Sequence, residues 1–557
     1  MPMIKEAEVR WREEYGKALQ KTPPRKEEFK NRSGISLQPI YTPLDLEGLD
    51  YLEKLGYPGE FPYTRGIYPA MYRGRTWSKR QLVGYEGPEH YNRRQKELLE
   101  RGQSAINFLP CNTFFRGYDV DQVEKELVGT CGTPVNILED MDIAFEGIPL
   151  REISVSFNDS GPFTGVAMLF ALAEARGIPL DRLAGTTSQS DFISHYSGGC
   201  NMYFRLSLEG HLRMFIDHVR FCTQNVPGWH PISVVAQHFQ DSGATPVQAL
   251  AFILSSGIFY VDQLVRSGLE VDSFAPRLSF FFAANVALFD EVAKFRAARR
   301  MWARIMRERF GAKNPRSLQF RFHVQSQGAD LTRQQPLNNI SRICLQALAS
   351  VLGGAQSIHT DAYDEAYQTP TEETARIALM TQSIIEEESG AADVVDPLGG
   401  SYYVEKLTDQ TEQLAWRYIE KIDGLGGMLE AVKRGYVQRE IGLAAYDYQK
   451  AVDSGQKVVV GVNKYQIPEQ QEFKLKWGKT DQAGVARHIQ RVRDHKQNRD
   501  QQRVGEALAD LRHAASEPSL NLFEATIKAV KSGVSHGEIV GELREIYGYG
   551  YPLTQGL

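Results

Sequence analysis

Basic and aromatic side chains alternate within residues 61–81, FPYTRGIYPAMYRGRTWSKRQ. The cations and the aromatic residues that stand between them are Arg65, Arg73, Arg75, Lys79, Arg80, Tyr68, Tyr72 and Trp77. Guanidinium groups bind phosphate in a forked geometry, and aromatic faces cover flat or apolar groups. The segment could therefore hold a phosphate-bearing ligand, although a solvated arm or a site for single-stranded nucleic acid has the same composition. The formal net charge of −5 gives no bulk basic field that favours nucleic acid.

A second candidate for chemistry is His238, which follows the apolar run PISVVAQ (231–237) at the end of an expected strand. Strand ends form the active site in barrel enzymes, and a histidine there can donate a hydrogen bond to a polarised carbonyl. A lone histidine at a strand end is more often structural, so His238 by itself decides nothing. The paired carboxylates that an unrelated barrel hydrolase would need at strand ends do not stand out.

The composition is that of an ordinary globular protein, with 42% apolar and 24% charged residues among 557. The N-terminal stretch MPMIKEAEVRWREEYGKALQ is charged and helix-like rather than a signal peptide. We see no apolar run that approaches the roughly 18 residues of a membrane span, and expect no membrane contact. The five cysteines are scattered without a CxxC pair, so we expect reduced thiols, a cytoplasmic location and no metal site.

Short apolar, β-prone runs alternate with helical stretches from about residue 88 onward. The six clear runs are SAINFL (104–109), EISVSF (152–157), PISVVAQ (231–237), RLSFFFA (277–283), LQFRFHV (318–324) and AQSIHT (355–360). Weaker candidates near 182–188 and 392–396 bring the number to eight. This alternation predicts βαβ units with a parallel sheet, and eight units suit a (β/α)8 barrel. A doubly wound open sheet is the alternative, because periodicity does not show closure.

Three regions are expected along the chain. Residues 1–85 form N-terminal helices and an extended arm, because Pro and Gly punctuate 39–85 too often for a long regular element. Residues 86–410 form the barrel, and residues 411–557 form a helical C-terminal region. The charged helices after residue 461 are explained by a solvated surface, and docking onto a partner subunit is the alternative.

Several motifs, in the same order, resemble those of the methylmalonyl-CoA mutase family. They are the arm segment 61–81, RGYDVD (116–121), SFAPRLSFFF (273–282), GGAQSIHTDAYDEA (353–366), EEESGAADVVDPLGGSYYVE (386–405) and VVVGVNKY (458–465). The resemblance runs from residue 40 to the C-terminus and is specific, because independent motifs carry it. It implies an α/β fold, a (β/α)8 TIM barrel whose axis holds the coenzyme A chain. It also implies an isomerase that moves a thioester group between neighbouring carbons by radical chemistry.

Members of this family use adenosylcobalamin, which a flavodoxin-like domain carries with a DxHxxG motif whose histidine binds the cobalt. No DxHxxG occurs in these 557 residues. The resemblance therefore implies the two-subunit arrangement of isobutyryl-CoA and 2-hydroxyisobutyryl-CoA mutases. In that arrangement we expect a cobalamin-binding small subunit, an acyl-CoA substrate, a heterotetramer and an associated GTPase chaperone.

The resemblance assigns residues to three tasks. His238 matches the histidine that donates to the thioester carbonyl, and Gln189 matches a glutamine that contacts the acyl group. The expected adenosyl contacts are Gln237, Asp241, Gln325, Gln356, Asp361 and Glu365, with Asp361 and Gln237 in place of the usual asparagine and tyrosine. The expected contacts of coenzyme A and substrate are Tyr68, Met71, Ser78, Arg80, Gln81, Leu82, Leu109, Gly199, Arg277 and Ser279.

Two departures from the family pattern concern a carboxylate on the substrate. Gly199 stands where methylmalonyl-CoA mutases place the arginine that clamps the substrate's free carboxylate, and Leu82 replaces their tyrosine. A buried carboxylate without a cation is strongly unfavourable. We therefore expect a branched or hydroxylated acyl-CoA that has no free carboxylate.

A third departure concerns a hydroxyl group. Hydroxyacyl mutases of the family carry an aspartate at the position of Leu109, and a leucine cannot bind a hydroxyl. The polar residues Asn112, Asn158, Asp159 and His195 could supply polarity instead. Helix capping or a role in holding loops explains them equally well, and for Asp159 it is the better explanation.

A catalytically silent paralogue that binds or regulates a mutase partner is the competing interpretation. The altered segments 107–115 and 156–163 favour it, whereas retained His238 and Gln356 favour an active enzyme.

Overall fold

The strands of this protein are short, and their pairings within the sheets are parallel. A computed structural model describes residues 2–24, 26, 28–84, 86–197, 205–474 and 481–549. Within them, one five-stranded sheet has the order β1-β10-β9-β8-β7 and another has the order β2-β3-β4-β5-β6. The bounds are β1 Ser78–Lys79, β2 Leu82–Val83, β3 Ile106–Phe108, β4 Val155–Asn158, β5 Gly185–Ser188, β6 Trp229–His230, β7 Ile232–Val235, β8 Leu278–Ala284, β9 Phe322–Ser326 and β10 Ser357–His359. Parallel strands separated by helices confirm the α/β class.

The two sheets share two stretches of chain, residues 78–83 and 229–235. In the first, β1 pairs with β10 and β2 pairs with β3. The N–H of Ser104 donates to Lys79 O (3.1 Å) while the N–H of Arg80 donates to Ile358 O (3.0 Å), so this stretch is bonded on both sides. In the second, β6 pairs with β5 and β7 pairs with β8. Eight strand positions thus follow in the order of a (β/α)8 barrel, and closure stays a prediction that this order supports.

Seven expected strands have counterparts, and the eighth prediction is wrong. β3, β4, β7, β8, β9 and β10 overlap the six clear runs, and β5 lies within 182–188. Residues 392–396 are turns and bends instead, because Pro397, Gly399 and Gly400 end the apolar run at once. The remaining position belongs to residues 78–83. These lie in the region expected as the arm, so the first barrel strand begins before residue 86.

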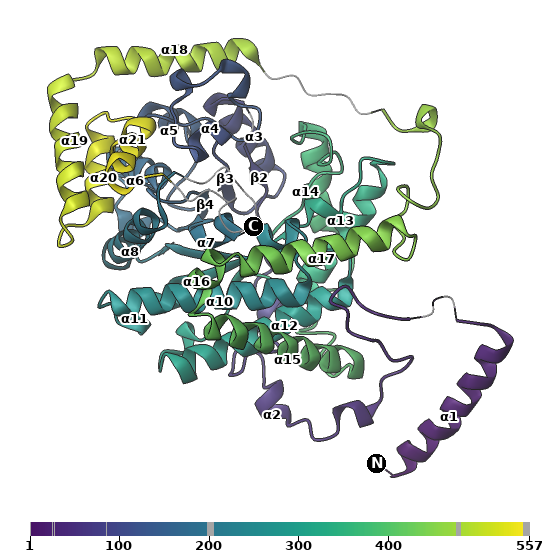
Figure 1. Ribbon diagram of the computed structural model, residues 1–557. Helices are drawn as coiled ribbons and strands as arrows, with labels where there is room; N and C mark the ends of the chain where they lie inside the picture. The colour runs from purple at the N-terminus through teal and green to yellow at the C-terminus, as the bar shows by residue number, and fades with distance from the viewer. Residues whose placement is uncertain are drawn as a thin grey trace.

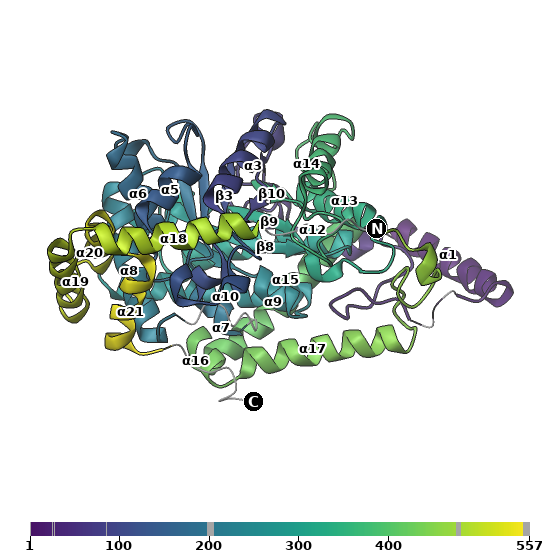
Figure 2. The same ribbon diagram turned by 90° about the horizontal axis from the view of Figure 1, so that it is seen from above.

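Helices cover the outer faces of both sheets (Figure 1, Figure 2). Those of the barrel region are α3 Pro88–Glu100, α4 Asn112–Phe115, α5 Leu138–Ala144, α6 Thr164–Ala175, α7 Phe192–Ser197, α8 Leu208–Asn225, α9 Gln237–Asp241, α10 Pro246–Arg266, α11 Val271–Phe274, α12 Leu288–Arg304, α13 Asn338–Leu352 and α14 Glu372–Glu387. The N-terminal region has α1 Pro2–Lys21, which projects from the body in Figure 1, and α2 Tyr51–Lys54. The C-terminal region has α15 Tyr402–Gly424, α16 Met428–Lys433, α17 Tyr436–Asp453, α18 Gln482–Asn498, α19 Gln501–Ser516, α20 Leu522–Lys531 and α21 His536–Tyr547.

α10 is long and apolar enough to cross a membrane by length and composition, contrary to the expectation that no run approaches this length. In this fold, 89% of its apolar stretch is buried inside the protein, as in a core helix. A capping box starts the helix. Thr245 Oγ1 accepts from the N–H of Gln248 (3.2 Å), and Gln248 Oε1 accepts from the N–H of Thr245 (2.9 Å). The cap fixes the start of a helix that packs behind β7.

The main hydrophobic core lies between the sheets and these helices. Phe280 of β8 lies against Trp302 of α12 with ring centroids 4.9 Å apart. On the other sheet, Phe108 of β3 lies against Tyr91 of α3 at 4.4 Å. Each such side chain stabilises the fold by roughly 1.5–3 kcal/mol when fully buried. The outer faces of the strands therefore carry much of the stability.

Buried arginines of α12 hold the N-terminal arm against the body. Arg299 donates from Nε to Tyr63 O (2.9 Å) and from Nη2 to Thr64 O (2.6 Å). The neighbouring Arg300 donates from Nη1 to Lys54 O (3.2 Å) and also pairs with the carboxylate of Asp409 on α15 (2.5 Å). Burial lowers the pKa of Arg299 to about 10, so it stays charged at neutral pH. The arm is thus held through its backbone carbonyls and not only through its aromatic side chains.

Asp119 of the RGYDVD motif anchors the C-terminal helices. This fully buried carboxylate accepts from the N–H of Gly537 on α21 (2.8 Å) and lies 2.9 Å from Lys496 Nζ on α18. It also accepts from Asn136 Nδ2 (3.1 Å). Residues 481–549 therefore pack onto helices of the α/β region, with α20 against α6 and α8. That this region also faces a partner stays a prediction.

Replacing Arg299 with methionine should destabilise the fold and release the arm. The buried carbonyls of Thr64 and Gly353 would lose the Arg299 donor, and that of Tyr63 would keep only the N–H of Gly66. We expect a loss of about 3–5 kcal/mol in the free energy of unfolding. Urea unfolding and the rate of tryptic cleavage after Arg65 measure the two effects. Arg73→Met, an exposed change on the same arm, is the control and should cost no more than about 0.5 kcal/mol. An Arg299→Met protein of normal stability would show that aromatic packing alone holds the arm.

Candidate active site

Polar residues occupy the faces of the strands that point away from the core. In β8 the core residues include Leu278, Phe280 and Phe282, so Ser279 and Ala283 point to the opposite, inner face. The strand register extends this inner face to Ser78, Asn107, Ser156, Asn158, Ser188, Ser233, His323, Gln325 and Ser357. Val, Ile and Leu normally fill the centre of a barrel of this size. Small polar side chains predominate on this face, together with the buried Val235 and Phe281, and we expect axial space for an extended polar ligand among them.

Arg80 brings a buried cation to the inner face. Its Nη2 donates to Ser154 Oγ (2.9 Å), just before β4, so the guanidinium points toward the amino ends of the strands. Burial lowers the pKa of Arg80 to about 10, and its Nε has no hydrogen-bond partner among the described residues. Of the predicted coenzyme A contacts, Ser78, Arg80 and Ser279 therefore share this face.

The other predicted coenzyme A contacts lie elsewhere. Tyr68 is 41% exposed on the arm, and Met71 is buried beneath it, against Gly354. Gln81 Nε2 donates to Thr360 Oγ1 (3.1 Å) and so ties β2 to β10. Arg277 precedes β8, where Nη1 donates to a backbone carbonyl at residue 273 (2.7 Å).

His238 lies at the carboxyl end of β7, in α9. The side chain is 7% exposed, and burial lowers its pKa to about 4, so the imidazole is neutral at pH 7. Its Nδ1 lies 3.0 Å from Ser194 Oγ, and its ring centroid lies 4.4 Å from that of His195. The Ser194 hydroxyl has one proton and also lies 3.2 Å from Asp191 O, so either partner can be the donor in its bond to His238 Nδ1. When Ser194 donates to Nδ1, the neutral imidazole carries its one N–H on Nε2. In that tautomer, His238 can donate from Nε2 to a carbonyl oxygen.

Asp191 holds Ser194 in place. Its carboxylate accepts from the N–H of Ser194 (3.2 Å), from Tyr260 Oη (2.5 Å) and from the N–H of Val235 (2.9 Å). The turn after β5 is thereby tied to the end of β7. Burial raises the pKa of Asp191 to about 6. Gln189, the predicted acyl contact, begins this turn in a left-handed conformation with φ 60° and is 6% exposed.

Two carboxylates, the half-buried Asp241 and the buried Asp361, stand beyond the carboxyl ends of β7 and β10. Asp361 accepts from Gln325 Nε2 (3.1 Å), and Asp241 accepts from Gln237 Nε2. Burial raises the pKa of each to about 7, and the nearby Asp361 charge also raises that of Asp241. Burial and the Asp361 charge likewise raise the pKa of Glu365, whose side chain reaches solvent. Among the described residues, Asp241 Oδ1 and Asp361 Oδ2 have no hydrogen-bond partner, so the cluster suits a ligand with several donors.

Gln356 does not join this cluster. It precedes β10, where its Oε1 accepts from the N–H of Phe322 (2.9 Å) and its Nε2 donates to Gly354 O (2.7 Å). Asp361 follows five residues later, about 16 Å along an extended chain. Gln356 and Asp361 thus flank opposite ends of β10, and a contact of Gln356 with the adenosyl group stays a prediction.

Apolar groups form the wall near the ends of β2 and β3. Leu82 lies in β2, and Leu109 follows β3 and packs against Phe114 and Phe115 of α4. Gly199, the third position predicted beside the acyl group, lies outside the described residues.

Asp159 caps α6, as the capping interpretation predicts. Its Oδ2 accepts from the N–H groups of Gly165 (2.8 Å) and Val166 (3.3 Å). Its Oδ1 lies 3.1 Å from Arg205 Nη1, and both side chains are fully buried. Arg205 stands six residues after Gly199 and was not anticipated, because nothing in the local pattern marks it. Its charge is balanced within the protein.

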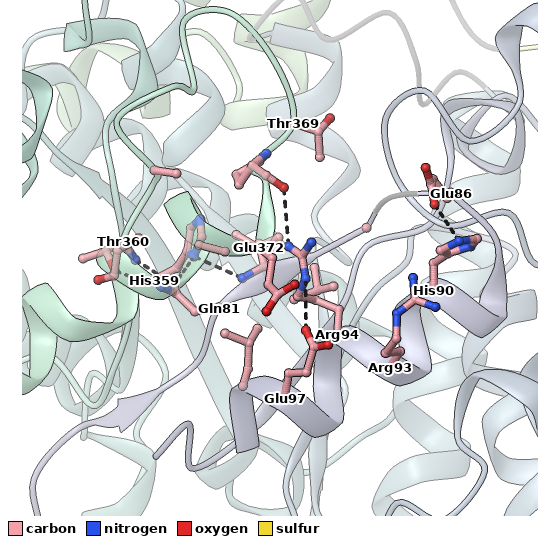
Figure 3. A pocket seen from close by; sticks show the side chains of 18 residues that line it. Gln81, Glu86, His90, Arg93, Arg94, Glu97, His359, Thr360, Thr369 and Glu372 are labelled. Atoms are coloured by element: carbon pink, nitrogen blue, oxygen red, sulfur yellow. Dashed lines mark hydrogen bonds and ion pairs between the residues drawn. The ribbon is translucent and has the colours of Figure 1, made fainter. Parts of the chain in front are cut away.

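A cavity of about 210 Å³ opens between α3 and α14, beside the junction of β2 and β10 (Figure 3). Arg94 reaches across it from α3 toward Pro370 O (3.4 Å) and lies 3.9 Å from Glu97. His90 lies 2.9 Å from Glu86. Arg94 and His90 thus lie near carboxylates, and although the predicted contacts Gln81 and Leu82 line the cavity, Arg80 and His238 do not. We do not place the active site here.

Comparison with known proteins decides the family. The model of the methylmalonyl-CoA mutase family matches residues 30–549. The chain belongs to the methylmalonyl-CoA mutase family. It is 40% identical over 537 residues to the 2-hydroxyisobutanoyl-CoA mutase large subunit of Aquincola tertiaricarbonis, covering 96% of this chain and 95% of that one. It is also 40% identical over 519 residues to the methylmalonyl-CoA mutase of Rhizobium meliloti, covering 92% of this chain and 72% of that one. The predicted resemblance is confirmed, and the chain is an isomerase of the acyl-CoA mutase type.

Replacing Asp361 with asparagine should stabilise this mutase at alkaline pH. A raised pKa means that the folded state binds the proton more tightly than the unfolded state. The contribution of protonated Asp361 to the free energy of unfolding is therefore fully present below about pH 4 and is lost as the pH rises through about 7. We expect Asp361→Asn to gain roughly 1–3 kcal/mol relative to wild type between pH 5 and pH 8, measured by urea unfolding. The control is the surface change Asp181→Asn. A difference in the free energy of unfolding between Asp361→Asn and wild type that is the same at pH 5 and at pH 8 would contradict the prediction.

Proposed function

We propose that this chain is the substrate-binding large subunit of an adenosylcobalamin-dependent mutase that acts on an acyl-CoA without a free carboxylate. The observation that carries the proposal is the polar inner face, which holds Arg80 and leads to neutral His238 at the carboxyl end of β7. The pantetheine part of coenzyme A is long and thin and carries amide and hydroxyl groups. Serine side chains along the strands suit such a ligand, and Arg80 suits its phosphate-bearing end.

His238 would act on the thioester carbonyl. As the thioester group moves between neighbouring carbons, partial negative charge develops on the carbonyl oxygen. A fixed N–H donor stabilises that charge in a site that excludes water. Because burial lowers the pKa of His238 to about 4, the residue donates a hydrogen bond without adding a positive charge. Ser194 and Asp191 would act as positioning residues that hold this donor.

The same neutrality argues against a substrate carboxylate. Burial lowers the pKa of both His238 and His195, so neither supplies a cation at neutral pH. The charge of Arg205 is balanced by Asp159 at 3.1 Å. A second carboxylate on the acyl group would then be buried without a partner, which is strongly unfavourable. Methylmalonyl-CoA is therefore a poor substrate under this proposal.

The carboxylate cluster supports the adenosyl cofactor. A nucleoside presents ribose hydroxyls and an adenine amine, and these donors match the unpartnered oxygens of Asp241 and Asp361. When bound, adenosylcobalamin supplies the radical that removes hydrogen from the substrate. Gln237, Gln325 and the two aspartates would orient the adenosyl group.

A partner subunit is proposed on two grounds. The Aquincola relative is named a large subunit, and this chain spans 95% of its length. α17 borders the end of the barrel that carries His238, because Ala445 packs against Gly243 just after α9. α17 also exposes the apolar side chains of Leu443 (55%) and Tyr446 (65%). We propose that a small subunit carrying DxHxxG docks at this end and brings cobalamin to it.

Reconstitution with such a small subunit and adenosylcobalamin tests the proposal. We expect turnover of at least one uncharged acyl-CoA, and a kcat/KM for methylmalonyl-CoA at least about 100-fold lower. His238→Ala should reduce kcat by about 100-fold or more while the Kd for acyl-CoA changes little, because the donor acts on developing charge. The exposed His513→Ala is the control and should behave as wild type.

Two results would overturn the proposal. Efficient isomerisation of methylmalonyl-CoA would refute the substrate class. Tight acyl-CoA binding without turnover of any ester would indicate the silent paralogue.

A further inference from the structure

Asn158 holds an unsatisfied acceptor at the end of β4. The side chain is fully buried, and its Nδ2 donates to Asn107 Oδ1 on β3 (3.2 Å). Its Oδ1 has no hydrogen-bond partner among the described residues. Buried amide oxygens are nearly always paired, because leaving one unpaired destabilises the fold. An oxygen of this kind on the inner face therefore points to a donor on the ligand.

Asn158 shares a wall of the site with His238. It is the register partner of Ser188 on β5. The chain continues into Gln189, whose backbone oxygen lies 3.3 Å from His195 Nε2, and the ring of His195 lies beside that of His238. The strands that carry Asn158 and His238 are two positions apart, about 10 Å at the usual spacing. A group on the acyl chain can thus reach Asn158 while His238 contacts the thioester carbonyl.

We propose that Asn158 accepts a hydrogen bond from a hydroxyl group on the acyl chain, so that the substrates are hydroxyacyl-CoAs. This inference rests on the proposed function and narrows it. A methyl group at this place would leave the amide oxygen unpaired, and a carboxylate would set an anionic oxygen against it. Leu109, on the neighbouring strand, packs with Phe114 and Phe115 and supplies no polar group. Asn158 therefore binds the substrate hydroxyl in place of a polar residue at position 109.

Three coenzyme A esters separate shape from hydrogen bonding. 2-Hydroxyisobutyryl-CoA and pivalyl-CoA have nearly the same shape and differ by a hydroxyl in place of a methyl, and isobutyryl-CoA lacks both groups. The wild-type kcat/KM should favour 2-hydroxyisobutyryl-CoA over pivalyl-CoA by at least about 30-fold. Isothermal titration of the chain alone should show the same order of Kd, independently of the cobalamin subunit.

Asn158→Leu should reduce the preference for the hydroxyl to within about threefold while turnover of isobutyryl-CoA persists. Asn158→Thr keeps an acceptor in a smaller side chain and should retain part of the preference. The double variant Asn158→Leu/Leu109→Asn moves the amide to the adjacent strand and should restore selectivity. Thermal unfolding of each variant reports whether the fold is intact.

Each outcome bears on a different claim. Wild-type preference for pivalyl-CoA over the hydroxy ester overturns the inference and leaves the mutase proposal standing. A preference that survives in folded Asn158→Leu overturns the role of Asn158. Failure of all three esters to bind or react overturns the proposed function itself.

Discussion

The two faces of each strand differ in chemistry, and the rest of the molecule depends on that difference. An ordinary barrel packs its centre with branched apolar side chains. Here serine, asparagine and histidine line the inner face, so the stabilising burial moves to the outer face, where Phe280 meets Trp302. Polar side chains at the centre add little apolar burial. The dense outer layer and its helices therefore carry the packing, and an axial passage for the ligand stays a prediction.

Neutrality at the carboxyl end follows from the same burial. His238 loses its charge there, Arg205 and Asp159 balance each other, and Asp241 and Asp361 have pKa values raised toward 7. Free charge is found at Arg80 instead, where the guanidinium points to the amino ends of the strands. The site thus has a charged group toward the amino ends of the strands and neutral groups at their carboxyl ends. A ligand charged at one end and neutral at the other fits it in one orientation only. Coenzyme A esters without a second carboxylate have that character.

The sequence predicts the strands whose outer faces are apolar and buried. It does not predict the polar contacts that form between strands at the site. Apolar alternation located seven strands, because their outer faces are buried. It missed residues 78–83, where Lys79, Arg80 and Gln81 interrupt the pattern, and it wrongly chose 392–396. The family resemblance named His238 and Asp361, which lie at strand ends, and also Gln356, which lies at the other end of β10. Ser194 and Asp191 were missed, since their roles depend on contacts between β5 and β7 that no local spacing encodes.

Hydrogen bonds and ion pairs made far from the inner face hold its strands in position. The arm continues directly into β1, so Arg299, which holds the carbonyls of Tyr63 and Thr64, also sets where Arg80 enters the barrel. On the other sheet, Asp119 binds α18 and α21, and α20 packs behind α6, which Asp159 caps. Asp119 of the RGYDVD motif therefore has an architectural role. The strand ends that carry Asn158 and His238 are held at their spacing by residues far from the ligand. Such a site keeps its geometry when its polar lining changes, and this explains how one scaffold can accept different acyl groups.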